Sequence, residues 1–171
     1  TTLLLDHGAA IDATDKTGWT PLDIACMWGK LAAAEALLQH RAFRECARTD
    51  WQGSPVVIAA DLGYYGVAEV FLRHGFDPNI PGADGATALW HAVRTKRLDV
   101  CRLLLDSKAD PDLTPDGATP PLIEAVKATN LDIVKLLVEQ GADIEKKEVS
   151  ENTWRRTPCK SFRLPNTNKD I

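Results

Sequence analysis

Residues 15–30 read DKTGWTPLDIACMWGK, and this stretch decides the fold of the chain. Thr20 is a good helix N-cap, and Pro21 suits the first helical position, where a missing N–H costs nothing. Positions spaced by three, four and seven residues from Leu22 form one stripe of a helix. The residues on this stripe are Leu22, Ala25, Cys26 and Gly29. Their small size predicts a helix that a neighbouring helix approaches closely.

The same pattern recurs along the chain at a fixed period. The four copies are anchored at Pro21, Pro55, Ala88 and Pro121, which lie 34, 33 and 33 residues apart. Ser54 precedes Pro55 as Thr20 precedes Pro21, and it is predicted to cap the second copy in the same way. Stripes equivalent to that of the first copy are Val56, Ala59, Ala60 and Gly63, then Leu89, Ala92, Val93 and Lys96, then Leu122, Ala125, Val126 and Thr129. One copy cannot bury its apolar face alone, so stacked copies are expected to share one elongated core.

Each copy is followed by a second apolar stretch, such as LLVEQGADIE at residues 136–145. Together the two stretches resemble the ankyrin repeat, whose pattern is D-x-x-G-x-T-P-L-H-x-A, a short helix, Gly, a second helix with I-V-x-L-L, and G-A-D-x-N. The resemblance covers residues 1–145, although Gly53 and Gly117 are displaced by one residue from the turn position. It implies an all-α solenoid of stacked helix–turn–helix units with protruding β-turns.

The period divides the chain into a series of units. Residues 1–14 match the second half of a truncated unit, complete units span 15–48, 49–81, 82–114 and 115–145, and residues 146–171 form a basic tail or degenerate fifth repeat. The tail holds RRTPCKSF at residues 155–162, which is similar to the start of another unit, and we expect it to be poorly ordered. The incomplete ends predict that the chain is a fragment of a longer protein.

Composition narrows the class of protein. A net charge of −4 and a pI near 5.5 argue against nucleic-acid binding, which needs clustered Lys and Arg. No apolar run approaches the roughly 18 residues of a membrane span, so no membrane insertion is expected. The four cysteines, at 26, 46, 101 and 159, lack the spacing of a zinc site or disulfide framework. We expect a monomer in the cytoplasm, with the nucleus left open.

Nothing in the sequence predicts catalysis. It holds no nucleophile elbow, P-loop or paired-carboxylate site, so we expect no enzyme activity, no catalytic residue, no cofactor and no metal. His7, His40 and His74 end second helices, where they can satisfy terminal carbonyls, and His91 is expected to be either structural or partner-facing. Asp residues at the turn tips stabilise turns, and Cys26 and Cys101 are expected to act as small buried hydrophobes.

The resemblance implies a binding surface. Partners of such proteins are held by the turn tips and the exposed inner face of the first helices. The residues carried over to this surface that we expect to bind are Trp19, Met27, Trp28, Trp51, Leu62, Arg94 and Lys127. The first five predict an apolar cluster at one end, and the two cations predict a short basic ladder that selects an acidic feature of the partner. The alternative is that Trp19 and Trp28 are buried between units.

The functional prediction is a non-catalytic module that binds another protein. The alternative is a regulatory ankyrin segment of a larger enzyme, ligase adaptor or channel whose activity lies outside this chain. A further alternative is a broken gene product that merely folds.

Overall fold

The computed structural model describes residues 10–16, 18–40, 54–82, 84–114 and 118–145. In this part of the chain the regular elements are eight α-helices in four antiparallel pairs. The pairs are α2 (Pro21–Met27) with α3 (Leu31–Gln39), α4 (Pro55–Leu62) with α5 (Tyr65–Arg73), α6 (Ala88–Arg94) with α7 (Leu98–Asp106), and α8 (Pro121–Lys127) with α9 (Leu131–Glu139). None of these helices is long and apolar enough to cross a membrane.

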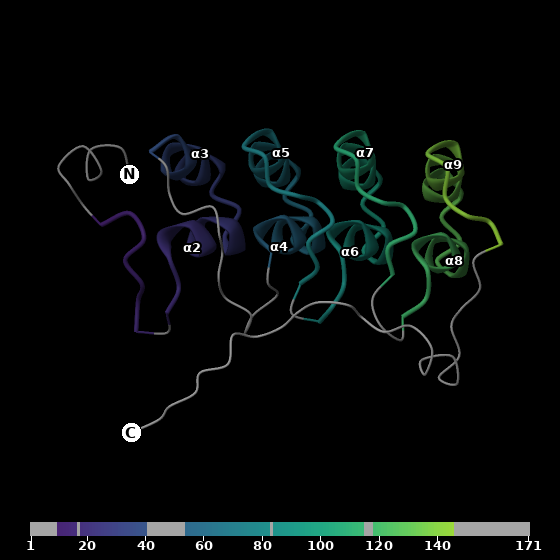
Figure 1. The fold of residues 1–171 in the computed structure, drawn as a ribbon, viewed down its shortest axis with the longest axis horizontal. Helices are drawn as coiled ribbons and strands as arrows, with labels where there is room; N and C mark the ends of the chain where they lie inside the picture. The colour runs from purple at the N-terminus through teal and green to yellow at the C-terminus, as the bar shows by residue number, and fades with distance from the viewer. Residues whose placement is uncertain (1–9, 17, 41–53, 83, 115–117, 146–171) are drawn as a thin grey trace, which may run out of the picture.

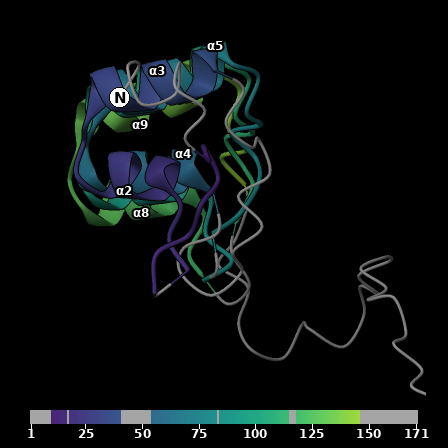
Figure 2. The same ribbon diagram turned by 90° about the vertical axis from the view of Figure 1, so that its left-hand side faces the viewer.

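The helix pairs stack side by side in two layers (Figure 1). The first helices α2, α4, α6 and α8 form one layer, and the second helices α3, α5, α7 and α9 form the other. Seen along the stack, the pairs lie behind one another and the connecting loops leave on the same side (Figure 2). The predicted all-α solenoid of helix–turn–helix units is confirmed.

Two of the first helices begin with a side-chain cap. Thr20 Oγ1 accepts from the backbone N–H of Asp23 at 3.2 Å, and the Asp23 carboxylate accepts from the N–H of Thr20 at 2.9 Å. Thr87 caps α6 by accepting from the N–H of Trp90 at 3.2 Å. The predicted cap at Ser54 is wrong, because its side chain makes no capping hydrogen bond. The start of α4 is held instead by burial of Pro55 and the residues that follow it.

The small-residue stripe of the first helices forms the centre of the core. Its members on α2, α4 and α6 are buried as predicted: Leu22, Ala25, Cys26, Val56, Ala59, Ala60, Leu89, Ala92 and Val93. On α8, Leu122 and Ala125 are buried, but Val126 is 57% exposed. The prediction that Val126 is buried is therefore wrong, because α6 covers only one side of α8 and no described first helix covers the other.

The last position of each predicted stripe lies beyond its helix, in the turn between the two helices of a pair. Gly29, Gly63, Lys96 and Thr129 occupy this position with φ of 60°, 74°, 60° and 55°. Glycine adopts this left-handed conformation without a Cβ penalty, whereas Lys and Thr are strained there. The turn conformation is thus conserved through the stack even where the sequence does not favour it.

Candidate functional site

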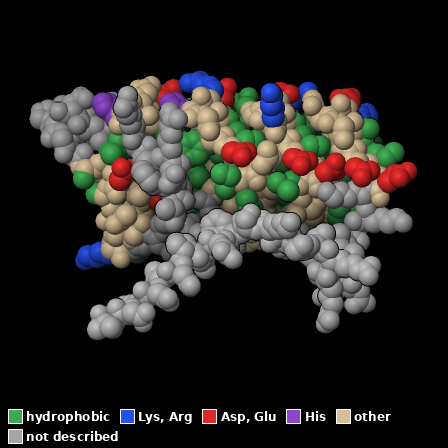
Figure 3. All heavy atoms as spheres, in the orientation of Figure 1, with side chains coloured by type: hydrophobic (Ala, Val, Ile, Leu, Met, Phe, Trp, Pro, Cys, Tyr) green, Lys and Arg blue, Asp and Glu red, His purple; other side chains and the backbone are tan. Residues whose placement is uncertain are grey.

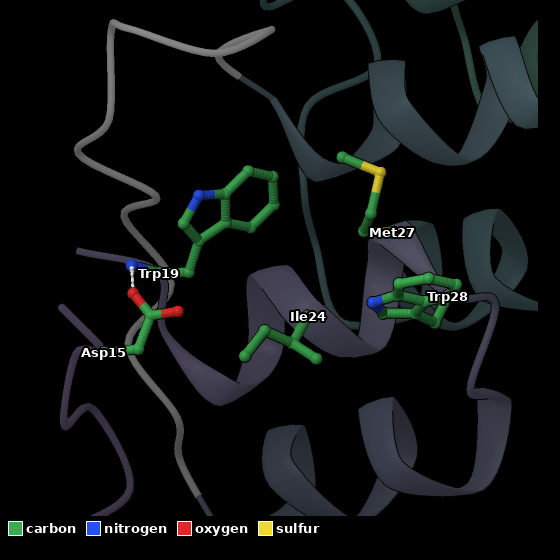
Figure 4. A pocket seen from close by; sticks show the side chains of 5 residues that line it. All are labelled: Asp15, Trp19, Ile24, Met27 and Trp28. Atoms are coloured by element: carbon green, nitrogen blue, oxygen red, sulfur yellow. Dashed lines mark hydrogen bonds between the residues drawn. The ribbon is translucent and has the colours of Figure 1, made fainter. Parts of the chain in front are cut away.

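An open hollow of about 300 Å³ lies beside α2. Its lining consists of Asp15, Trp19, Ile24, Met27 and Trp28. Figure 4 shows the ring of Trp19 and the side chains of Met27 and Trp28 standing around a space above Ile24. The structure therefore brings together three of the residues predicted to bind a partner. Four of the five lining residues are aliphatic, aromatic or thioether side chains, and the fifth is Asp15.

The turn before α2 places Trp19 at this hollow. The N–H of Asp15 donates to the carbonyl oxygen of Trp19 at 3.0 Å, and the N–H of Gly18 donates to that of Asp15 at 2.9 Å. Asp15 Oδ1 also accepts from the N–H of Trp19 at 2.9 Å (Figure 4). Gly18 has φ of 81°, which suits glycine. The predicted turn role of Asp15 is confirmed, and the tight turn fixes the position of the Trp19 backbone.

The residues of the hollow are more exposed than most others in the layer of first helices. Trp28 ends α2 and is 67% exposed, so it is not buried between units. Trp19 and Met27 are half-buried. Ile24 is 41% exposed, whereas Ile58 at the same position of the next unit is 5% exposed. An exposed apolar patch of this kind is typical of an interaction site.

The predicted cluster has two further members, Leu62 and Trp51. Leu62 ends α4 at the position equivalent to Trp28, and it is exposed, but it is not among the lining residues. Trp51 lies outside the described residues. The apolar cluster in the structure is therefore centred on α2 and the turn before it.

The two predicted cations take equivalent positions at the ends of α6 and α8. Arg94 Nη2 lies 3.2 Å from Asp61 Oδ1, and its guanidinium lies 5.0 Å from the centroid of the Trp90 ring. Lys127 Nζ donates to Thr119 Oγ1 at 3.2 Å. Both side chains are exposed, but the charge of Arg94 is already shared with a carboxylate of the neighbouring unit.

A polar network around His91 and Trp90 joins neighbouring units, and the sequence did not predict it. His91 is buried, with Nδ1 3.0 Å from Asp61 Oδ1 and Nε2 3.1 Å from Asp84 Oδ2. Trp90 Nε1 donates to the carbonyl oxygen of Thr119, in the turn before α8, at 3.0 Å. Of the two roles left open for His91, the structure shows the structural one.

The repeat register carries a signal for part of this network. Asp61 and Arg94 lie 33 residues apart, which places opposite charges at the same position of adjacent units. Asp84 was predicted only to stabilise its turn, which it does by accepting from the N–H of Ala86 at 3.0 Å. Its second contact, with His91, needs the three-dimensional path of that turn and has no signal in the sequence.

Two thiols lie in the core. Cys26 and Cys101 are buried free cysteines, as predicted. Burial, followed by the nearby Asp99 carboxylate, raises the pKa of the Cys101 thiol from 9.0 to about 12. The reactive thiolate of Cys101 is therefore scarce at neutral pH. Among the described residues, no group of three or more His, Cys, Asp or Glu side chains is placed to hold a metal ion.

Comparison with protein families matches most of the chain to one family. The family description "Ankyrin repeats (3 copies)" matches residues 56–148, more than half of the chain, and "Ankyrin repeats (many copies)" matches residues 1–38.

Curated proteins with similar sequences are longer than this chain. A putative ankyrin repeat-containing protein of Treponema pallidum (strain Nichols) is 35% identical over 111 residues, which cover 65% of this chain and 37% of that protein. Ankyrin repeat domain-containing protein 63 of Mus musculus is 42% identical over 72 residues, covering 42% and 18%. Neurogenic locus notch homolog protein 1 of Danio rerio is 29% identical over 110 residues, covering 64% and 4%. The chain thus spans well under half the length of each.

Proposed function

We propose that this chain, which belongs to the ankyrin repeat family, binds another protein on the surface formed by its turns and first helices. Ankyrin repeats are generally non-catalytic modules for protein–protein interaction, and the proposal applies that role to a particular surface of this chain. The observation that carries it is the apolar hollow at α2, with Trp28 standing 67% exposed at its edge.

The lining of the hollow supports an apolar contact as the main anchor. Large aromatic side chains often dominate binding energy, because they exclude water over a large area. Trp19 is held by its turn and Trp28 by the end of α2, so little backbone order has to be gained on binding. An aliphatic or aromatic side chain of the partner fits between them.

The basic ladder has a secondary part in this proposal. Arg94 and Lys127 are exposed at the ends of α6 and α8, toward the other end of the layer of first helices. There they favour an acidic feature of the partner. Arg94 must give up or share its contact with Asp61 when it binds an acidic group of the partner. Its net contribution to affinity is therefore expected to be smaller than that of Trp28. We place the interaction in the cytoplasm and the chain as a monomer, as the sequence predicts.

A second candidate is a segment that regulates a larger protein. It is supported by the comparison in which the matched residues make up 4% of the notch homolog. Under this candidate, the hollow is covered by the first helix of a unit preceding α2, and not by a separate protein. Ile58 and His91 occupy the position of Ile24 in later units and are buried, and His91 contacts α4 of the preceding unit.

A comparison of three forms of the chain tests the proposed site. The intact chain, Trp28→Ala and Tyr65→Ala are used to capture proteins from a cell lysate, and captured proteins are identified by mass spectrometry. Tyr65 is the matched control, because it is an exposed aromatic residue at the start of α5, in the layer of second helices. We expect one protein to be captured by the intact chain and Tyr65→Ala but lost from Trp28→Ala. Equal capture by all three forms, with equal helix content by circular dichroism, would remove the hollow from the proposal.

A further inference from the structure

The last described unit exposes apolar residues whose equivalents in earlier units are buried or half-buried. Val126 of α8 is 57% exposed, whereas Cys26, Ala60 and Val93 at the same position are 0% exposed. These equivalents are covered because each first helix packs against the next one along the stack. The exposed side of α8 is therefore a stacking face, built to pack against a further element.

The second helix and the loop after it extend this face. Val138 of α9 is 46% exposed, whereas at the same position Leu38 and Leu105 are 6% and 5% exposed and Leu72 is half-buried. Ile144 is exposed, whereas the equivalent Pro78 is buried and Pro111 is half-buried. We call Val126, Val138 and Ile144 the terminal face. Water contact with these three apolar side chains is unfavourable, so an occupant that covers them stabilises the fold.

We propose that residues 154–164 of this same chain dock on the terminal face and close the stack. These residues follow the last described unit after a short connection, and they read WRRTPCKSFRL. Thr157-Pro158 repeats the capped start of a first helix. From Pro158 to the residue before Pro165 there are seven residues, the length of α2, α6 and α8. Helices usually end at or before the residue that precedes a proline, so a helix starting at Pro158 ends by Leu164 and is at most as long as these first helices.

The connection is long enough for this docking. Residues 146–153 link the last described residue to the proposed segment. Eight extended residues reach about 26 Å, whereas neighbouring helices pack about 10 Å apart. Trp154, Cys159 and Phe162 give the segment apolar side chains to place on Val126 and Val138.

Charge favours the same occupant. Residues 146–171 contain seven Lys or Arg and three Asp or Glu. Exposed carboxylates occur on α9 and the loop after it, and acidic side chains form a row toward this end of the molecule (Figure 3). The carboxylates concerned are Asp132, Glu139, Asp143 and Glu145. Attraction of the basic segment to these carboxylates lowers the free-energy cost of ordering the segment.

A double-mutant cycle in the full-length chain tests this docking. Stability is measured by urea unfolding for the intact chain, Val138→Ala, Phe162→Ala and the double variant. Residues in contact show coupling, whereas distant residues are additive. We expect the unfolding constant of the double variant to be at least about threefold smaller than additivity predicts, because the second substitution removes a contact already lost. Ile80→Ala with Phe162→Ala is the control pair and should be additive, since Ile80 is exposed in the loop before α6.

Two outcomes would overturn the docking. Additivity of Val138→Ala with Phe162→Ala would show that the two residues do not meet. Sedimentation of the intact chain as a dimer that Val138→Ala dissociates would assign the terminal face to a second copy instead. Neither outcome bears on the hollow, because α2, which helps to line it, lies at the other end of the stack from α8 and α9 (Figure 1).

Discussion

At the residue scale, Thr129 carries the clearest backbone strain in the structure. Its φ of 55° is left-handed, a conformation that costs a non-glycine residue about 1–2 kcal/mol and that a β-branched residue rarely adopts. Glycine removes this cost but loses about 0.5–1 kcal/mol more backbone entropy on folding. We therefore predict that Thr129→Gly raises the free energy of unfolding by about 0.5–1 kcal/mol, measured by urea denaturation.

Thr129→Ala is the control for this prediction. It removes the β-branch but keeps a Cβ in the left-handed region, so it should stabilise less than Thr129→Gly. If the two variants are equally stable, the strain does not come from the left-handed backbone and the interpretation is wrong.

Cys101 gives a prediction about pH. Its pKa is raised by burial to about 12, so the folded state holds the thiol proton to higher pH than the unfolded state does. Its contribution to stability is complete below pH 9 and is lost as the pH rises toward 12, by up to about 1.4 kcal/mol per pH unit. The intact chain should therefore lose stability relative to Cys101→Ala between pH 9 and pH 10.5.

Cys101→Ala is a suitable reference because Ala34 and Ala68 occupy the same position in other units and are fully buried. Groups that titrate in both proteins cancel in the difference. A stability difference that stays constant from pH 7 to pH 10.5 would contradict the raised pKa.

Single residues were predicted well where local geometry decides their role. Thr20 caps its helix, and Trp28 points away from the buried stripe, because helical spacing alone fixes both. Ser54 was not predicted correctly, since the cap depends on which way a hydroxyl turns in a buried setting. Helix-capping propensity predicts that serine suits this position, but it does not predict whether the hydroxyl makes the capping hydrogen bond.

At the element scale, the network around His91 ties α4, α6 and the turn before α6 together. Its two ring nitrogens contact Asp61 and Asp84, so a leucine in its place removes both bonds and leaves Asp84 without this partner. Hydrogen bonds to charged groups contribute about 1.5–3 kcal/mol each, and Asp84 is half-exposed, which reduces the loss. We predict that His91→Leu lowers the free energy of unfolding by about 2–3 kcal/mol.

His74→Leu is the matched control for this prediction. His74 Nδ1 contacts the carbonyl oxygen of Val70 in its own helix at 2.8 Å, so its loss should cost less. Urea unfolding of both variants measures the difference. Equal losses would show that the contacts between units add nothing to those within a helix.

The elements themselves were predicted because caps, stripes and glycines repeat four times. The contacts between elements were predicted less well. The pairing of Arg94 with Asp61 turns a predicted partner contact into one that is partly internal, and only comparison of equivalent positions in adjacent units would have indicated it. The exposure of Val126 depends on what lies beyond α8, which no local pattern contains.

At the scale of the whole molecule, the period of the sequence determines the architecture. Helix pairs that recur every 33 or 34 residues give two layers of helices, and each layer grows by contact with the next pair alone. The predicted fold class is therefore confirmed. The surface is a different matter, because stacking leaves the exposed positions free to vary and the family does not specify the partner.

The hollow at α2 was predicted in part for the same reason. Trp19, Met27 and Trp28 follow from the register of the first unit, but Ile24 and Asp15 do not. Ile24 lines the hollow because it is exposed where Ile58 of the next unit is buried, and Asp15 because its turn folds back onto Trp19.

The most direct test of the central claim is the affinity of the captured protein for Trp28→Ala, measured by isothermal titration beside the intact chain and Tyr65→Ala. Truncating an aromatic residue that anchors an interface costs about 2 kcal/mol or more. We predict that Trp28→Ala raises the dissociation constant about 30-fold or more, while Tyr65→Ala leaves it unchanged. A dissociation constant for Trp28→Ala within twofold of that for the intact chain would contradict binding at the hollow.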